Sequence, residues 1–218
     1  MMATVLERVC ASRIVPVVTI EQAAHAQGLG SALIAGGLPL AEVTFRTAAA
    51  ADAIRVLRDN HPDILVGAGT VLDPETVDLA VEAGATFIVA PGFNPRMVDH
   101  CLERGVPVIP GVCTPSEIEQ GLERGLTLMK FFPAEAAGGL SLLTAMAAPY
   151  RVVRFMATGG INRQNLNEYL DSPWVAACGG TWLAPSADMA DGRFSDITAN
   201  VREAVALART AHPFPSED

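Results

Sequence analysis

Residues 64–84, ILVGAGTVLDPETVDLAVEAG, contain the repeating unit that decides the fold. A short apolar run leads into a glycine-containing turn. Asp73 and Pro74 then supply a capping side chain and a proline suited to the first position of a helix. Gly84 is the residue type that commonly ends a helix. The segment therefore predicts one buried strand, one turn and one amphipathic helix.

The same unit recurs along the chain. Similar capping pairs stand at Asn94-Pro95 and Thr114-Pro115, and Thr114 with Glu117 has the spacing of a capping box. The predicted strands cover residues 14–18, 41–45, 64–68, 86–90, 106–109, 126–131, 153–157 and 174–178. Near-continuous apolar strands alternating with helices favour an α/β fold with a parallel sheet.

We therefore expect a (β/α)8 TIM barrel with an N-terminal helix, formed by a single domain over residues 1–210, with residues 211–218 as a flexible tail. An open, doubly wound sheet is the competing architecture. Gly28 and Gly30 slightly resemble a dinucleotide-binding loop, but the third glycine is missing and the pair lies in a helical stretch.

Composition narrows the function classes. The 218 residues carry a formal charge of -9 without a basic cluster, which disfavours nucleic acid as a partner. No apolar run reaches the ~18 residues of a membrane span, and no signal peptide is expected. The four cysteines lack CxxC spacing and the four histidines are scattered, so we expect a cytoplasmic protein with reduced thiols and no metal site.

Lys130 is the only lysine in the chain, and it ends the apolar strand at residues 126–131. An amine can form an imine with a carbonyl, whereas a guanidinium stays protonated and cannot. Buried lysines are rare without a reason. From its position alone, a reactive amine and a salt-bridged structural lysine are equally good interpretations.

Polar residues gather at the carboxyl ends of other predicted strands, where barrel enzymes keep their active sites. Alternation directs Glu42, Thr44 and Arg46 into the barrel mouth, although the two charges there could simply pair with each other. Glycine-rich turns follow further strands at residues 67–70, 158–160 and 179–181. The last two favour an anion site over ordinary turns.

Five segments together resemble the 2-keto-3-deoxy-6-phosphogluconate (KDPG) and 4-hydroxy-2-oxoglutarate (KHG) aldolases. In family order they are EVTFRT at 42–47, GAGTVL at 67–72, KFFPAE at 130–135, TGGI at 158–161 and GGTWL at 179–183. The resemblance implies a class I, Schiff-base aldolase that is homotrimeric and needs no metal or other cofactor. Its substrate would be a small 2-keto acid, phosphorylated in the case of KDPG, and neither a nucleic acid nor a membrane would be a partner.

The resemblance also assigns roles. Lys130 would form the imine and Glu42 would be the general acid and base. The implied substrate-binding residues are Arg46 and Thr70 at the pyruvate carboxylate, Pro91 and Phe132 around the imine, and Thr158, Gly159, Gly160, Gly180 and Thr181 at the phosphate.

The implied reaction cleaves KDPG to pyruvate and glyceraldehyde 3-phosphate, and KHG to pyruvate and glyoxylate. Alternatives are the galactonate epimer as substrate, a phosphate-binding barrel isomerase or epimerase, and a non-catalytic sugar-phosphate module. Two positions depart from the usual family pattern: Thr181 replaces a serine and Ala157 replaces a proline. The added methyl of Thr181 predicts an altered fit to the phosphate, and Ala157 predicts a looser turn before Thr158.

Overall fold

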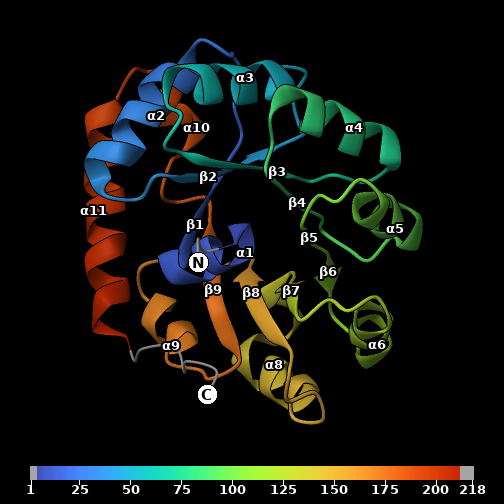
Figure 1. Ribbon diagram of the computed structural model, residues 1–218. Helices are drawn as coiled ribbons and strands as arrows, with labels where there is room; N and C mark the ends of the chain where they lie inside the picture. Colours follow the sequence, from blue (N-terminus) through green and yellow to red (C-terminus); the bar gives the residue numbers. More distant parts are fainter. Residues whose placement is uncertain (1–3, 212–218) are drawn as a thin grey trace.

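The computed structural model describes residues 4–211, which form a ring of parallel strands surrounded by helices (Figure 1). The strands hydrogen-bond in the order β5-β4-β3-β2-β1-β9-β8-β7-β6. Their bounds are β1 Ile14–Val18, β2 Leu40–Thr44, β3 Leu65–Gly69, β4 Phe87–Val89, β5 Val108–Ile109, β6 Gly111–Val112, β7 Leu128–Phe131, β8 Arg154–Thr158 and β9 Val175–Gly180. Sequential strands are neighbours, as in a barrel and unlike a doubly wound sheet.

The helices connect successive strands on the outside of this ring (Figure 1). Their bounds are α1 Val5–Ser12, α2 His25–Gly36, α3 Ala50–Asn60, α4 Pro74–Ala83, α5 Pro95–Glu103, α6 Pro115–Glu123, α7 Ala134–Ala137, α8 Gly139–Ala147, α9 Leu166–Leu170, α10 Ser186–Ala190 and α11 Phe194–Thr210. Gly28 and Gly30 lie inside α2, in the helical stretch where they were predicted. Residues 1–3 and 212–218, which include most of the expected tail, lie outside the described part.

The barrel closes through a strand that Pro110 divides in two. β5 pairs with β4, and β6, which begins one residue after Pro110, pairs with β7. Proline has no N–H to donate, but its carbonyl accepts the N–H of Lys130 at 2.8 Å. The fifth predicted strand, at residues 106–109, therefore corresponds to β5, and β6 continues the same barrel position beyond Pro110. The predicted barrel is confirmed.

The predicted helix starts are observed. The Asp73 side chain accepts the N–H of Thr76 at 2.8 Å, and Asn94 and Thr114 cap α5 and α6. The capping box at Thr114 differs in one detail: the Glu117 carboxylate accepts the N–H of Cys113, one residue before the cap, at 2.8 Å.

One end of the barrel is covered and the other is open. α1 lies across the opening in the view along the barrel (Figure 1) and is separated from the start of β1 only by Arg13. The Arg13 guanidinium donates to the carbonyls of Val175 and Ala176, each at 3.2 Å, which ties this corner to the start of β9. The strands therefore begin at the covered end and finish at the open one.

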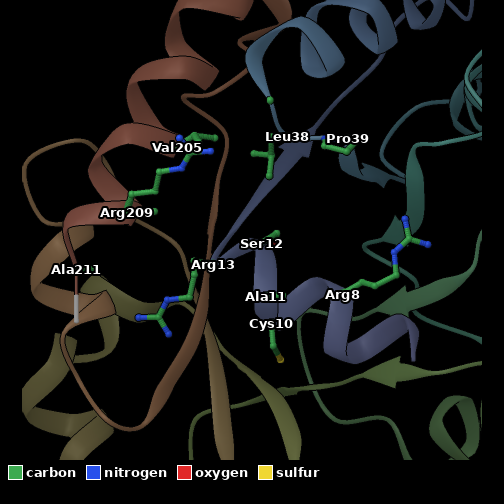
Figure 2. A pocket seen from close by; sticks show the side chains of 12 residues that line it. Arg8, Cys10, Ala11, Ser12, Arg13, Leu38, Pro39, Val205, Arg209 and Ala211 are labelled. Carbon is green, nitrogen blue, oxygen red and sulfur yellow. The ribbon is translucent and has the colours of Figure 1, made fainter. Parts of the chain in front are cut away.

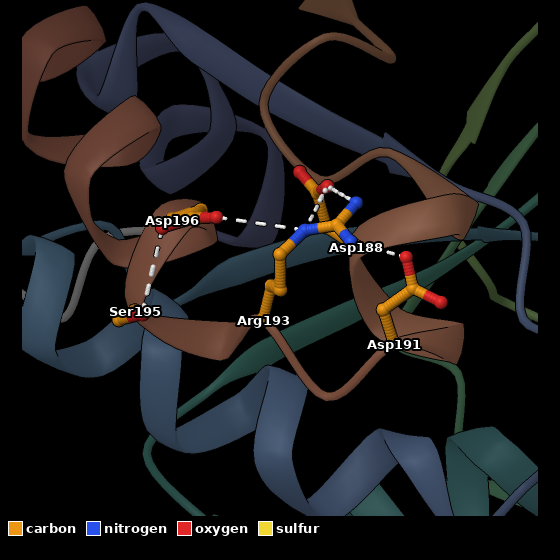
Figure 3. A network of polar contacts seen from close by, with 5 residues as sticks. All are labelled: Asp188, Asp191, Arg193, Ser195 and Asp196. Carbon is orange, nitrogen blue, oxygen red and sulfur yellow. Dashed lines mark hydrogen bonds and ion pairs between the residues drawn. The ribbon is translucent and has the colours of Figure 1, made fainter.

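Arg193 ties α10 to α11 (Figure 3). Its guanidinium lies between α10 and α11 and pairs with Asp188 at 2.6 Å, with Asp196 at 3.6 Å and with Asp191. Three carboxylates thus share one cation. No helix within residues 4–211 is both long enough and apolar enough to cross a lipid bilayer.

Candidate active site

Within residues 4–211 the buried polar or charged side chains are Glu42, Thr44, Lys130 and Thr158. All four lie near the carboxyl ends of β2, β7 and β8, at the open end of the barrel. Burying polar groups is costly unless they are paired or used. Their concentration at one end of an otherwise apolar core marks this end as the site.

Lys130 and Glu42 form the centre of the site. The Lys130 Nζ lies 3.3 Å from the Glu42 Oε1, and the lysine and glutamate are 5% and 0% exposed. β2 and β7 are not neighbours in the sheet, so the two side chains meet across the barrel interior. Within the described residues the second carboxylate oxygen, Oε2, has no hydrogen-bond partner. This pair combines an amine with a base that retains an accepting atom.

An aromatic ring bounds the amine as well. The Phe132 ring centroid lies 5.3 Å from the Lys130 Nζ, within the range of a cation–π contact. The ion-pair partner of Glu42 is Lys130, and within the described part of the chain Glu42 forms no ion pair with Arg46. The sequence alternative of a Glu42–Arg46 pair is not observed.

A cavity of about 180 Å³ opens above this pair. Every predicted site residue except Glu42 and Gly180 lines it: Arg46, Thr70, Pro91, Lys130, Phe132, Thr158, Gly159, Gly160 and Thr181. Glu42 lies behind Lys130, and Gly180 ends β9 between two lining residues, Gly179 and Thr181. The predicted residues come together, while their individual roles stay predictions.

Three further lining residues, Val17, Ile161 and Gly179, were given no site role from the sequence, although Ile161 and Gly179 lie in segments that carry the family resemblance. They offer apolar surface or backbone, so they carry no chemical signal of their own. Val17 could have been found from strand pairing, because it stands opposite Glu42 in the β1–β2 register. Gly179 faces Thr158: a Cβ there would lie 2.5 Å from the Thr158 Oγ1.

Close packing against Gly69 fixes the position of the Glu42 carboxylate. An added Cβ at Gly69 would lie 2.3 Å from Oε1 and 2.7 Å from Cγ of Glu42. Both residues are on adjacent strands, with Thr44 as the register partner of Gly69. Only glycine leaves the carboxylate where it reaches the lysine.

Thr70 has a left-handed backbone, with φ of 56°. Such a conformation is unfavourable for a β-branched residue, and conformations of this kind concentrate at functional sites. The left-handed conformation turns the chain at the end of β3, and Thr70 lies at the cavity wall.

The turn after β8 presents backbone donors. The carbonyl of Gly159 accepts the N–H of Glu135 at 3.0 Å, and that of Gly160 accepts the side-chain amides of Asn162 and Asn165, both at 3.1 Å. The two glycines have φ of 101° and 83°. Backbone N–H groups in a glycine turn of this kind form an anion-binding concavity.

A larger hollow lies at the opposite, covered end. This groove of about 930 Å³ runs between α1, the start of β2 and α11 (Figure 2). Arg8, Arg13 and Arg209 line it but point apart from one another (Figure 2). Burial raises the pKa of the nearby Cys10 thiol to about 11, which disfavours the reactive thiolate. The larger hollow therefore lacks convergent chemistry.

Comparison with known proteins agrees with this geometry. Residues 5–200 match the model of the family described as KDPG and KHG aldolase. A curated relative from Treponema pallidum (strain Nichols), named 2-dehydro-3-deoxy-phosphogluconate aldolase, is 51% identical over 198 residues, which cover 91% of this chain and 94% of the relative.

Two solved structures are similar over nearly their whole length. The 2-keto-3-deoxy-6-phosphogluconate aldolase of Zymomonas mobilis ZM4, solved with 3-phosphoglycerate, is 39% identical with a TM-score of 0.88, covering 97% of this chain and 99% of that one. The KDPG aldolase from Legionella pneumophila, with pyruvate captured as a covalent carbinolamine intermediate, has the same identity and TM-score and covers 92% and 97%. The chain therefore belongs to the KDPG and KHG aldolase family.

Proposed function

We propose that this chain is a class I aldolase that cleaves 2-keto-3-deoxy-6-phosphogluconate to pyruvate and glyceraldehyde 3-phosphate. The observation that carries the proposal is the buried Lys130 amine, 3.3 Å from the Glu42 carboxylate at the floor of a small cavity. Family membership supports it, as does the carbinolamine described for the Legionella pneumophila protein. Cleavage of 4-hydroxy-2-oxoglutarate to pyruvate and glyoxylate is proposed as a second activity.

The reaction begins at the lysine. The neutral Lys130 amine attacks the C2 carbonyl carbon of the substrate, which gives a carbinolamine. Loss of water from this intermediate leaves a protonated imine. Glu42 supplies and removes protons in these steps, directly or through one water, because its carboxylate lies beside the amine.

The imine then serves as the electron acceptor. Glu42 takes the proton from the C4 hydroxyl, the C3–C4 bond breaks, and its electron pair moves onto C3 as an enamine while the aldehyde leaves. Protonation at C3 and hydrolysis of the imine release pyruvate and regenerate the amine. Arginine in place of Lys130 cannot form the imine, because a guanidinium remains protonated.

The two ends of the cavity would hold the two anionic ends of the substrate. Arg46 and Thr70 are proposed to bind the pyruvate carboxylate, since an arginine recognises a carboxylate bidentately. Pro91 and Phe132 shape the wall around the imine. The phosphate is proposed to lie on the turns after β8 and β9, held by the residues Thr158, Gly159, Gly160, Gly180 and Thr181.

Borohydride trapping tests the chemistry. Incubation with pyruvate and borohydride is expected to add one pyruvyl group, located at Lys130 by peptide mass spectrometry. Lys130→Arg is expected to give no adduct and no turnover, with an unchanged circular dichroism spectrum. An unlabelled but active wild-type protein would reject the Schiff base and favour the isomerase alternative. Kinetics with the gluconate and galactonate epimers and with 4-hydroxy-2-oxoglutarate would rank the substrates.

We also propose a cytoplasmic homotrimer. Four cysteines without a disulfide support a reducing compartment. Exposed leucines on the neighbouring helices α4 and α5, Leu79 and Leu102 at 51% and 42%, support an apolar contact between copies. Light scattering of the purified protein tests the assembly: a mass of one chain would reject the trimer.

A further inference from the structure

Trp182 and Arg163 form a stack directly behind the two proposed phosphate turns. The Arg163 guanidinium carbon lies 5.2 Å from the centroid of the Trp182 ring. Arg163 follows the glycine turn after β8, and Trp182 follows Thr181 after β9. The stack therefore joins the two segments that would hold one phosphate, from the side away from the cavity.

The tryptophan is fitted against the second turn. An added Cβ at Gly180 would lie 2.7 Å from the Trp182 Nε1 and 2.9 Å from its Cδ1. The edge of the indole thus lies on the backbone of Gly180, next to the cavity-lining Thr181. Leu183, fully buried, anchors the following residue in the core. The ring therefore sets the path of the backbone at Gly180 and Thr181.

The arginine is held from the outside by the last helix. Its Nε lies 2.9 Å from the Glu203 Oε2, and its Nη2 donates to the side-chain oxygen of Asn200, both on α11. A hollow of about 360 Å³ adjoins this contact, with Asn162, Pro185 and Trp182 among its lining residues. The indole packs against the core on its inner side, and the arginine contacts the ring beside the hollow.

We propose that the Arg163–Trp182 stack positions the two phosphate turns and thereby sets the preference for phosphorylated over unphosphorylated 2-keto acids. Neither side chain lines the cavity, so they act as positioning residues and not as catalytic ones. This inference rests on the proposed function, because it requires that the phosphate binds at these turns.

A second stack on the same two strands provides a matched control. The Arg154 guanidinium carbon lies 5.9 Å from the Trp174 ring centroid. Arg154 begins β8 and Trp174 precedes β9, so this pair lies at the covered end of the barrel. Removing either stack takes away the same type of contact, and only one of them is attached to the phosphate turns.

The kinetic test compares two substrates. Arg163→Ala and Trp182→Leu are expected to raise KM for the phosphorylated substrate about three- to tenfold, leaving kcat and all constants for 4-hydroxy-2-oxoglutarate nearly unchanged. Trp182→Phe keeps an aromatic ring, so its KM for the phosphorylated substrate is expected to stay close to that of the wild type. Arg154→Ala and Trp174→Leu are expected to leave the ratio of the two kcat/KM values as in the wild type. An equal loss with both substrates would overturn the inference.

Fluorescence tests the same contact without turnover. The chain has two tryptophans, so Trp174→Phe leaves Trp182 as the single reporter. Titration with inorganic phosphate is expected to change the Trp182 emission in a saturable way. An unchanged Trp182 emission at phosphate concentrations that competitively inhibit the enzyme would overturn the inference. If wild type failed to cleave the phosphorylated substrate, the proposed function would fail, whereas this titration would still decide on the stack.

Discussion

Adding one methyl group at Gly69 is expected to damage catalysis more than stability. The backbone of Gly69 lies in β3 outside the left-handed region, so alanine fits its conformation. The added Cβ would lie 2.3 Å from the Oε1, 2.7 Å from the Cγ and 2.8 Å from the Cδ of Glu42. Contacts below 3 Å at a fully buried glutamate force one of the two groups to move.

The carboxylate is the group that can move, because it is the end of a side chain while β3 is hydrogen-bonded on both sides. A shift of Glu42 relieves most of the overpacking, so Gly69→Ala should cost only about 1 kcal/mol of unfolding free energy. The same shift lengthens the 3.3 Å contact with the Lys130 Nζ. A displacement of about 1 Å in such a constellation lowers the rate by roughly 10²-fold.

The assay is pyruvate release coupled to lactate dehydrogenase, with urea unfolding measured on the same preparations. Gly67→Ala is the matched control on the same strand, β3, because the atoms nearest to its added Cβ belong to the Phe87 ring on β4, the first at 2.2 Å, and not to Glu42. We expect Gly67→Ala to lose stability but keep most of its kcat. Full activity of a folded Gly69→Ala protein would show that the position of Glu42 is not set by this contact.

Three further predictions concern stability. Thr70→Gly should raise the free energy of unfolding by about 0.5–1 kcal/mol, as relief of its left-handed strain exceeds the entropic cost of glycine, and should weaken pyruvate binding in a trapping assay. Burial, then the hydrogen bond to Glu135, raises the pKa of Tyr169. Above about pH 10 the unfolded chain loses the Tyr169 proton while the folded state keeps it, so the free energy of unfolding should fall as the pH rises. Urea unfolding should show a less steep fall for Tyr169→Phe. Arg193→Ala should lower the free energy of unfolding measured in urea at low salt, and lower it less at high salt, because the side chain is 44% exposed and three carboxylates lose their shared cation.

Much of the site was predictable because its chemistry depends on residue types that are rare elsewhere in the chain. A single lysine at a strand end, and a carboxylate and an arginine at alternating positions of another strand, identify the open end of the barrel. Alternation was sufficient for Glu42 and Arg46, since one face of a parallel barrel strand must point inward.

Other features depend on contacts between distant segments, which a single sequence does not contain. Gly69 has an ordinary strand conformation, and its need for glycine arises only from Glu42 on the adjacent strand. The left-handed backbone of Thr70 contradicts its local preference, so no propensity predicts it. The division of the fifth strand follows from Pro110, which has no N–H to donate to a neighbouring strand and lies just beyond the strand predicted at residues 106–109.

The division at Pro110 leaves Lys130 on one of the short seams of the barrel. β7 is joined to β6 by a ladder of two residue pairs, Gly111 with Lys130 and Val112 with Phe131, whereas β2 and β3 share five. Local opening of the native state begins where few hydrogen bonds must break. Hydrogen exchange at the Lys130 amide, bonded to the Pro110 carbonyl, would therefore report how often the barrel opens locally beside the proposed nucleophile.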